Sequence, residues 1–415
     1  MNKHSINLDI LRAVAALSVV FYHLSLLCKT FDPFFTIDVI RYRFPGHLCV
    51  LVFFILSGYV IGKNTKQLSN GPQIGEYLKK RLVRLVPIYV IAIIFTAFVA
   101  FGKYSFKTIL SNLFFASVPF DDVMTENGPL WSLQFEIFYY LVFIGFSYWR
   151  LDLIKSIGVT FSVIAILFFA SFKMVIPPLP VSILIGFAFW LTGAALADQN
   201  TYVAWQIKGS RVMSVFLLLF SIAYFNPYAP VIKFLKLKLP DYSGYSEFHQ
   251  LITYYDIYFY PLAVLLILTL TRTYIKSFKF LLIFLMGFST LVMLFIPVNY
   301  NWQYFIQKNY PIPAMLLLTS IILWAMNTNF KTSLNPLKHR IASISDISYA
   351  IYIIHSPLIY LFGIYPAQSW FAFTVKLLLY FVTLILLSYF LEMKYQVWIK
   401  SLFFKKKTIG MSAGS

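Results

Sequence analysis

The sequence has few charged residues. Only 12% of its 415 residues are Asp, Glu, Lys or Arg, whereas soluble domains carry about 25%. Hydrophobic residues make up 60% of the chain, and the mean hydropathy is +0.76. A water-soluble core cannot bury this much apolar surface, which excludes a soluble globular protein. Because the apolar runs are about 20 residues long and do not alternate with a period of two, we expect membrane-spanning helices.

Acidic residues and cysteines are scarce as well. The chain has 15 acidic against 34 basic residues, a formal net charge of +19. We interpret this excess as the basic bias of cytoplasmic membrane loops, and we expect no nucleic-acid partner. The two cysteines, Cys28 and Cys49, flank the first predicted outer loop. A disulfide would require an oxidising compartment, so a pair of free membrane thiols is the favoured interpretation.

Twelve apolar segments predict an all-α, polytopic helical bundle with ten to twelve transmembrane helices. With a cytoplasmic N-terminus, 22 of the 34 basic residues fall on the cytoplasmic side, and Arg12 and Lys376 lie inside spans. This asymmetry predicts that both termini are cytoplasmic. The predicted spans are centred near residues 18, 55, 93, 139, 166, 188, 220, 261, 287, 318, 355 and 380.

The predicted spans form one transmembrane domain over residues 1–400. Residues 401–415 are expected to form a basic, disordered cytoplasmic tail. The segment 106–118 is too short for a span, and we expect an interfacial helix there. We detect no linker rich in Gly or Ser and no fixed repeat, which gives no support for a solenoid or an inverted-repeat transporter.

Two ionisable residues share one face of the first apolar segment. Arg12 and His23 are eleven residues apart, about three helical turns, so both side chains point the same way, ~16 Å apart along the axis. Ionisable groups inside a span are costly and usually functional. A neutral imidazole can take a proton from an attacking hydroxyl. A hydrogen-bonded packing histidine is the alternative.

A pair of arginines lies at the predicted cytoplasmic mouth of the third span. Arg81 and Arg84 follow Lys79 and Lys80 and are three residues apart, hence neighbours on a helix face. Two guanidiniums in this arrangement can clamp phosphate groups. The alternative, which the pattern by itself favours, is an ordinary basic anchor at the lipid headgroups.

Glu136 lies in an otherwise apolar span. A carboxylate there costs several kcal/mol unless it is paired or neutral. We expect it at a depth similar to that of His23, where it would orient the imidazole and raise its basicity. A structural ion pair with Arg12 or Lys376 is the alternative.

Weaker candidates are hydroxyl, aromatic and imidazole side chains close in sequence to these groups or inside other spans. Close helix packing explains them equally well. The remaining histidines have no metal-ligand spacing, and we expect no metal. The weaker candidates are Trp131, Ser132 and Tyr139 around Glu136, Ser57 and Tyr59 in the second span, and Tyr349, Tyr352 and His355 in the eleventh.

Six segments together resemble the membrane-bound acyltransferase-3 family. They occur in the family's order and span almost the whole chain. The family O-acylates bacterial surface polysaccharides, lipopolysaccharide among them, with acetyl-coenzyme A as the usual donor, and it implies about ten core spans. The segments are LDILRAVAALSVVFYH, FFILSGYVIG, KKRLVRLVPIY, GPLWSLQFEIFYYL, SYAIYIIHSP and SYFLEMKY.

The resemblance implies roles for individual residues. Arg12 and His23 match the family's essential arginine and histidine, and Arg81 and Arg84 match its paired arginines near the cytoplasmic face. The other matches are Ser57, Gly58 and Tyr59 in the Ser-Gly-Tyr block, Trp131, Ser132, Glu136 and Tyr139 in the Trp–Ser–Leu–Glu–Tyr block, and Tyr349, Tyr352 and His355 in the late block.

We therefore expect a multi-pass O-acyltransferase of the bacterial inner membrane. It would move an acyl group, acetyl first of all, from acyl-coenzyme A to a hydroxyl of a surface glycan or a lipid-linked sugar. Arg81 and Arg84 would bind the phosphates of the donor, and the pantetheine arm would thread from there toward His23. His23 would act as general base, oriented by Glu136; an acyl-histidine intermediate is the alternative. No permanently bound cofactor is expected.

Two other functions compete with this prediction. A transporter or flippase of a lipid-linked sugar would also place charges inside spans, but it would act without an acyl donor. A glycan polymerase is disfavoured because the outer loops hold only two arginines, Arg41 and Arg43. Some relatives carry a soluble hydrolase-like domain after the membrane part. This sequence, which ends at Ser415, is expected to lack one, so a partner acyltransferase is the alternative to transfer by this chain alone.

Overall fold

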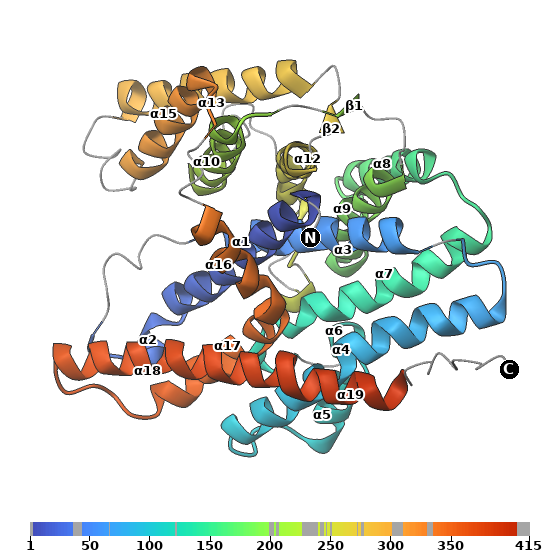
Figure 1. The fold of residues 1–415 in the computed structure, drawn as a ribbon, viewed down its shortest axis with the longest axis vertical. Coiled ribbons are helices and arrows are strands. Elements are labelled where there is room, and N and C mark those ends of the chain that lie inside the picture. The colour runs from blue at the N-terminus through green and yellow to red at the C-terminus, as the bar shows by residue number, and fades with distance from the viewer. Residues whose placement is uncertain are drawn as a thin grey trace, which may run out of the picture.

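The computed structural model shows a bundle built almost entirely of α-helices (Figure 1). Arg41, Arg43, most of the predicted outer loop 230–255 and the end of the chain lie outside the described residues. The structure describes residues 3–35, 44–65, 67–120, 123–198, 203–204, 207–225, 240, 245, 247–249, 251–271, 273–274, 278–300, 310–329 and 335–404.

Nine helical segments within the described residues are long and apolar enough to cross a membrane. Some consist of two or three helical elements that follow one another in the chain. They are α1 (Lys3–Leu26), α3 (Gly46–Asn64), α4 (Gly71–Val99), α7 (Leu130–Tyr148), α8 (Leu153–Ala170), α9 (Pro178–Asp198), η3 to α12 (Glu247–His249, η4 Tyr254–Tyr258, Phe259–Leu270), α16 to α17 (Asn335–Ile344, η6 Ser345–Ile347, Ser348–Gly363) and α18 to α19 (Trp370–Tyr389, the π-helical η7 Phe390–Tyr395, Gln396–Phe403).

Three further helices are also apolar, but they are shorter when only the residues with described side chains are counted. Together, the nine and the three correspond one to one with the twelve apolar segments predicted from the sequence. The predicted all-α membrane bundle is therefore confirmed, with nine candidate spans in the described part against the ten or so that the resemblance implies. The three helices are α10 (Gly209–Phe225), α13 (Phe278–Tyr300) and α15 (Pro311–Met326).

Short elements connect the long helices. A short helix, α5, lies in the segment 106–118, and its eight residues are too few to cross a bilayer. That it lies at the membrane interface stays a prediction. The two strands pair antiparallel over two residues each, and both cysteines are free thiols, as expected. The short elements are α2 (Cys28–Phe31), α5 (Phe106–Leu113), α6 (Ser117–Phe120), η2 (Thr125–Asn127), β1 (Val203–Ala204) and β2 (Thr273–Tyr274).

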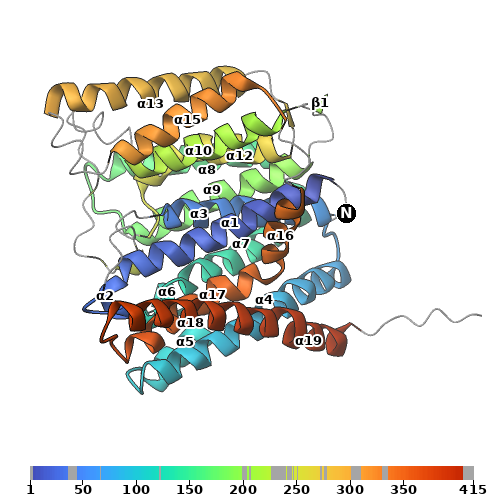
Figure 2. The same ribbon diagram turned by 60° about the vertical axis from the view of Figure 1, so that its left-hand side comes forward.

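The helices form a layer with α1 near its middle. α1 packs against α3, α16 and α17, and α17 in turn contacts α4 and α18. Helices α10, α13 and α15 gather at one end of the layer, and α5 and α18 lie at the other (Figure 1). Figure 2 shows the beginning of α1 and the end of α19 on the same side, as an even number of crossings requires. That this side is cytoplasmic stays a prediction. α19 continues to Phe403, past the predicted tail boundary.

Helices α3 and α9 approach each other closely because small residues line their contact. A Cβ atom on Gly58 would lie 1.8 Å from the carbonyl oxygen of Trp190, and one on Gly193 would lie 2.0 Å from that of Ile55. Neither glycine can carry a side chain without moving a backbone. The packing interpretation of the Ser-Gly-Tyr block therefore applies to Gly58, and this contact fixes the depth of its neighbour Ser57.

We expect Gly58→Ala to destabilise the protein. Forcing a methyl group against a backbone carbonyl costs about 1–3 kcal/mol. Thermal unfolding in detergent would show a lower midpoint for this variant. The control is Gly158→Ala in α8, where a Cβ atom meets nothing within 4 Å. Equal midpoints for the two variants would contradict the close α3–α9 contact.

A buried salt bridge ties α2 to α18. Asp32, which is fully buried, accepts hydrogen bonds from Lys376 at 3.0 Å and from the backbone N–H groups of Phe34, Phe35 and Ala367. Burial raises the pKa of Asp32, but these hydrogen bonds outweigh it, so the pKa lies below the ordinary value of 3.8. The carboxylate is therefore ionised near neutral pH.

We expect Asp32→Asn to lower stability at neutral pH and to matter less in acid. Because the folded-state pKa lies below the unfolded value, the ionised carboxylate stabilises the fold above about pH 4, and this contribution is lost as the pH falls through the folded pKa. Unfolding midpoints of wild type and variant between pH 7 and pH 3 would test it. A gap between the two proteins that stays constant or widens in acid would contradict the assignment.

Candidate functional site

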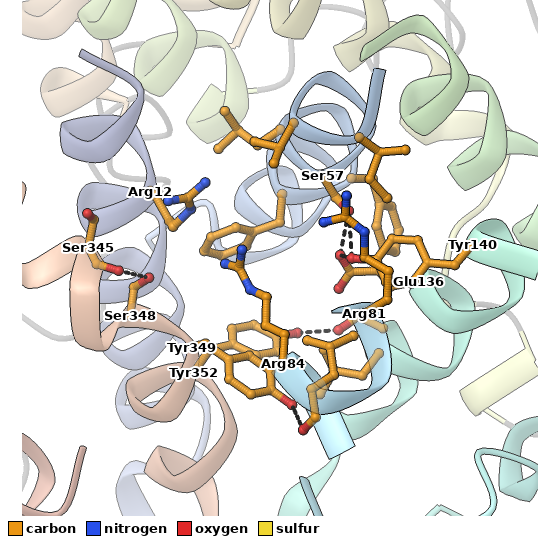
Figure 3. Close-up of a pocket in the computed structure, with 18 of the residues that line it drawn as sticks. Arg12, Ser57, Arg81, Arg84, Glu136, Tyr140, Ser345, Ser348, Tyr349 and Tyr352 are labelled. Atoms are coloured by element: carbon orange, nitrogen blue, oxygen red, sulfur yellow. Dashed lines mark hydrogen bonds between the residues drawn. The ribbon is translucent and has the colours of Figure 1, made fainter. Parts of the chain in front are cut away.

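A cavity of about 320 Å³ opens among α1, α3, α4, α7 and α17 (Figure 3). Its lining mixes charged and hydroxyl groups with apolar side chains. It brings together eight of the residues singled out from the sequence, which come from five different helices. They are Arg12, Ser57, Arg81, Arg84, Ser132, Glu136, Tyr349 and Tyr352.

Helix α4 brings Arg81 and Arg84 to this cavity. Its 29 residues span about 44 Å at 1.5 Å per residue, more than the ~30 Å hydrocarbon core of a bilayer. The polar first turns after Gly71 therefore extend beyond the core, and the two arginines fall near its boundary. Asn70 begins the helix by accepting a hydrogen bond from the backbone N–H of Gln73.

The three guanidiniums of the cavity are incompletely neutralised. Arg12 approaches Asp9 at 3.6 Å, and Arg81 donates a long hydrogen bond of 3.5 Å to Thr65. Arg81 Nε is buried without a partner, and exposed Arg84 forms no salt bridge with the described residues. Figure 3 shows all three side chains pointing into the same space. Positive groups gathered between low-dielectric walls attract anions.

Glu136 is held by hydroxyl groups. Ser57 Oγ and Tyr140 Oη each donate a hydrogen bond of 2.5 Å to Glu136 Oε1. The indole N–H of Trp190 donates to Ser57 Oγ at 3.3 Å, which fixes the serine from the α9 side. The carboxylate thus faces the cavity and accepts hydrogen bonds from two O–H donors.

The predicted partners of Glu136 are wrong. His23 contacts other residues, described below, and Arg12 and Lys376 form their salt bridges with aspartates. The sequence placed two groups at similar depth on different helices, but depth does not fix which way each helix turns about its axis. That rotation is set by packing, here by the contacts of α1 with α3, α16 and α17 and of α7 with α3 and α9.

Tyr140 occupies the place expected of Tyr139. Both follow Glu136 by about one turn, so the sequence alone does not separate them. Tyr139 is fully buried, packs against Gly186 and donates its hydroxyl hydrogen bond to the carbonyl of Ile183, away from the cavity. Tyr140 instead faces the carboxylate.

Two histidines contact each other beside the cavity. His355 Nε2 lies 3.2 Å from His23 Nδ1. His355 Nδ1 is 2.8 Å from the Tyr352 carbonyl and 3.2 Å from that of Ile351, and His23 Nδ1 is 3.0 Å from the Val19 carbonyl. Carbonyls only accept, so both Nδ1 atoms carry the proton in the neutral pair. His355 Nε2 then accepts from His23, and His23 Nε2 is left with its lone pair.

The cavity ends short of the histidine pair. Neither histidine lines it, whereas Tyr352, one turn before His355, does. Tyr352 Oη and Ser132 Oγ form a hydrogen bond of 2.7 Å, and both also lie within 3.3 Å of the Pro129 carbonyl oxygen. The open path expected from the paired arginines to His23 is therefore not present in the described residues, where Tyr352 lies between the cavity lining and the neighbouring His355 ring.

Two further residues from the sequence lie away from the cavity. Tyr59 is buried, and its ring faces Lys63 Nζ at 5.9 Å. Trp131 packs edge-on against Phe54 and Phe135. Both serve the packing between helices, which was the alternative interpretation of these blocks.

Six polar residues of the lining are not among the candidates chosen from the sequence. Glu392 carries the same signal as Glu136, an acid near an apolar span. The other five carry no signal of their own, because the turn and helices that hold them meet the cavity only in the folded protein. The six are Tyr140, Ser345, Asp346, Ser348, Glu392 and Lys400.

Ser356, the residue after His355, contacts the short helix η2, which lies outside the membrane-spanning helices. Ser356 Oγ donates a hydrogen bond of 2.9 Å to the carbonyl of Glu126, whose carboxylate accepts from Tyr104 and Lys103. Burial raises the pKa of Glu126, but these hydrogen bonds outweigh it and hold the pKa below its ordinary value. Glu126 thus contacts α17 through its backbone carbonyl and Lys103 and Tyr104 through its carboxylate.

Comparison with known proteins agrees with the family expected from the sequence. A family model described as an acyltransferase domain matches residues 5–280. An O-acetyl transferase of Shigella phage Sf6 is 25% identical over 151 residues. This match covers 32% of the present chain and 43% of the relative, so the chain spans less than half of that protein's length. No solved structure matches the chain.

Proposed function

This chain belongs to the acyltransferase family whose model it matches, and we propose that it is a membrane O-acyltransferase. The proposed reaction moves an acetyl group from acetyl-coenzyme A to a hydroxyl of a surface glycan or a lipid-linked sugar at the bacterial inner membrane. The single observation that carries the proposal is the incompletely neutralised guanidinium cluster of the cavity beside the histidine pair.

The cavity suits the anionic donor. Arg81 and Arg84 are free to make charge-assisted hydrogen bonds to phosphate oxygens, which are stronger than bonds between neutral groups. A volume of about 320 Å³ is at the lower end for small-molecule sites. It fits one part of coenzyme A, while the rest of the donor extends beyond the mouth of the cavity.

His23 acts as the general base in this proposal. Its Nε2 takes the proton of the acceptor hydroxyl as the hydroxyl oxygen attacks the thioester carbonyl. The tetrahedral intermediate collapses, the C–S bond breaks, and the coenzyme A thiolate leaves and takes the proton from His23. The Val19 carbonyl and His355 Nε2 both face the Nδ1–H group of His23 and keep it in the tautomer whose Nε2 can accept a proton, the role first expected of Glu136.

The reaction requires Tyr352 to move. Its hydrogen bonds to Ser132 and to the Pro129 carbonyl separate the cavity from His23. Each such bond contributes about 1 kcal/mol net, so opening costs about 2 kcal/mol. Binding of the donor can supply this amount. Tyr352 thus keeps water from the cavity away from His23 until the donor is bound.

We expect His23→Gln to reduce acetyl transfer by at least about 10²-fold, because general-base catalysis contributes about 10²–10⁴-fold. His355→Ala should cause a smaller loss, since it removes one of the two acceptors that face the His23 Nδ1–H group but leaves the base. The measurement is transfer of labelled acetyl from acetyl-coenzyme A to surface glycans in membranes with equal amounts of each variant.

The control is His249→Gln. This histidine also contacts a backbone carbonyl, that of Val118 at 2.9 Å, but lies outside the site. Its replacement should leave transfer unchanged. Near-normal transfer by a well-inserted His23→Gln protein would remove the assignment of the base, and transport of a lipid-linked sugar without any acetyl transfer would overturn the proposed function.

We expect Arg84→Gln to weaken coenzyme A binding about tenfold, because a hydrogen bond to a charged group contributes about 1.5–3 kcal/mol and solvent in the cavity screens part of it. Isothermal titration in detergent would measure the affinity. Arg150→Gln is the matched control, since Arg150 is an exposed arginine at the end of α7 that does not line the cavity. Equal affinities for the two variants would make Arg84 a lipid anchor.

A further inference from the structure

A fourth basic side chain reaches the cavity from the last helix of the described chain. Lys400 belongs to α19 (Gln396–Phe403) and lines the same cavity as Arg12, Arg81 and Arg84. It lies far beyond residue 280, where the match to the family model ends. The site is therefore completed by a helix that the family comparison does not include.

A proline in α4 creates the contact that docks α19. Pro87 lies inside α4 and has no backbone N–H, so the carbonyl of Val83, four residues earlier, lacks its helical partner. The buried side chain of Gln396 donates a hydrogen bond of 2.6 Å to this carbonyl. Lys400 is one helical turn after Gln396 and shares its face, and Arg84 directly follows Val83. The docking contact thus brings lysine and arginine to one rim.

The charges at this rim leave Lys400 available to a ligand. Its ammonium forms no hydrogen bond or salt bridge with the described residues, and the residue is exposed. Glu392, also in the lining, feels the electrostatic influence of both Arg84 and Lys400 without a salt bridge to either among the described residues. The rim therefore holds two cations beside Glu392, with Asp346 also in the lining, and neither cation is bound in a salt bridge among the described residues, so an incoming anion can reach both.

We propose that Lys400 binds the phosphate groups of the donor together with Arg84, and that Glu392 competes with those phosphates for the two cations. This inference rests on the proposed function and adds a binding residue to it. A bound phosphate gains from Lys400 and is opposed by the like charge of Glu392. The two residues should therefore change donor affinity in opposite directions.

Lys394 provides a matched control for Lys400. Both are exposed lysines near the end of the same helical segment, but Lys394 does not line the cavity. If Lys400 were only an anchor for lipid headgroups, the two lysines would be equivalent. Substitution at either position removes one positive charge from the same region without touching the packed core.

The experiment measures binding of coenzyme A to the full-length protein in detergent, at low and at high salt. At low salt we expect Lys400→Gln to weaken binding about three- to tenfold, Lys394→Gln to leave it unchanged, and Glu392→Gln to tighten it about threefold. High salt should reduce each difference, because mobile ions screen the interaction of exposed charges. Unfolding midpoints of all variants verify that the fold is intact.

The outcomes separate this inference from the proposed function. If wild type binds coenzyme A and the two lysine variants bind equally well, Lys400 is not a donor ligand, although the function stands. Weaker binding by Glu392→Gln would overturn the competing role of that carboxylate. If wild type binds no coenzyme A at either salt concentration, the proposed function itself fails.

Discussion

A charged side chain within a membrane protein must pair with an opposite charge or contact water, and this requirement determines how the interior of the bundle is arranged. Asp32 and Lys376 meet it by pairing where α2 contacts α18. The guanidiniums of the cavity meet it only in part, because Arg12 has one long salt bridge, to Asp9, and Arg81 and Arg84 form none with the described residues. Positive charge that is left unpaired is unfavourable for the empty protein and favourable for binding an anion. The incomplete pairing of the guanidiniums therefore identifies the site and explains why the cavity must remain open to water or ligand.

Helix α17 connects this charged cavity to the histidine pair. Tyr352 lines the cavity, and its backbone carbonyl accepts the hydrogen bond from His355 Nδ1 that fixes the tautomer of that ring. His355 Nε2 in turn contacts His23 Nδ1 on α1 and so restrains the orientation of the His23 ring. One helix therefore holds both the barrier and the orientation of the base, so a movement of α17 would affect access and protonation together.

The sequence predicted the helices and much of the lining, but not the contacts within the site. Arg12, Arg81, Arg84 and Glu136 were found because each interrupts an apolar run or stands at its edge, where charge is costly. The contact of His23 with His355 was not found, since 332 residues separate them and both are only single polar groups in apolar helices.

What the sequence by itself determined is the membrane class, the twelve apolar segments, and the ionisable residues that no lipid-facing surface would tolerate. Length, composition and hydrophobic periodicity are local properties, and the chain carries them before it folds. Only the tertiary structure decided which tyrosine meets Glu136, which histidine orients His23, and that Lys400 joins the arginines. These depend on how each helix is rotated and docked, which close contacts such as Gly58 against α9 and Gln396 against α4 decide.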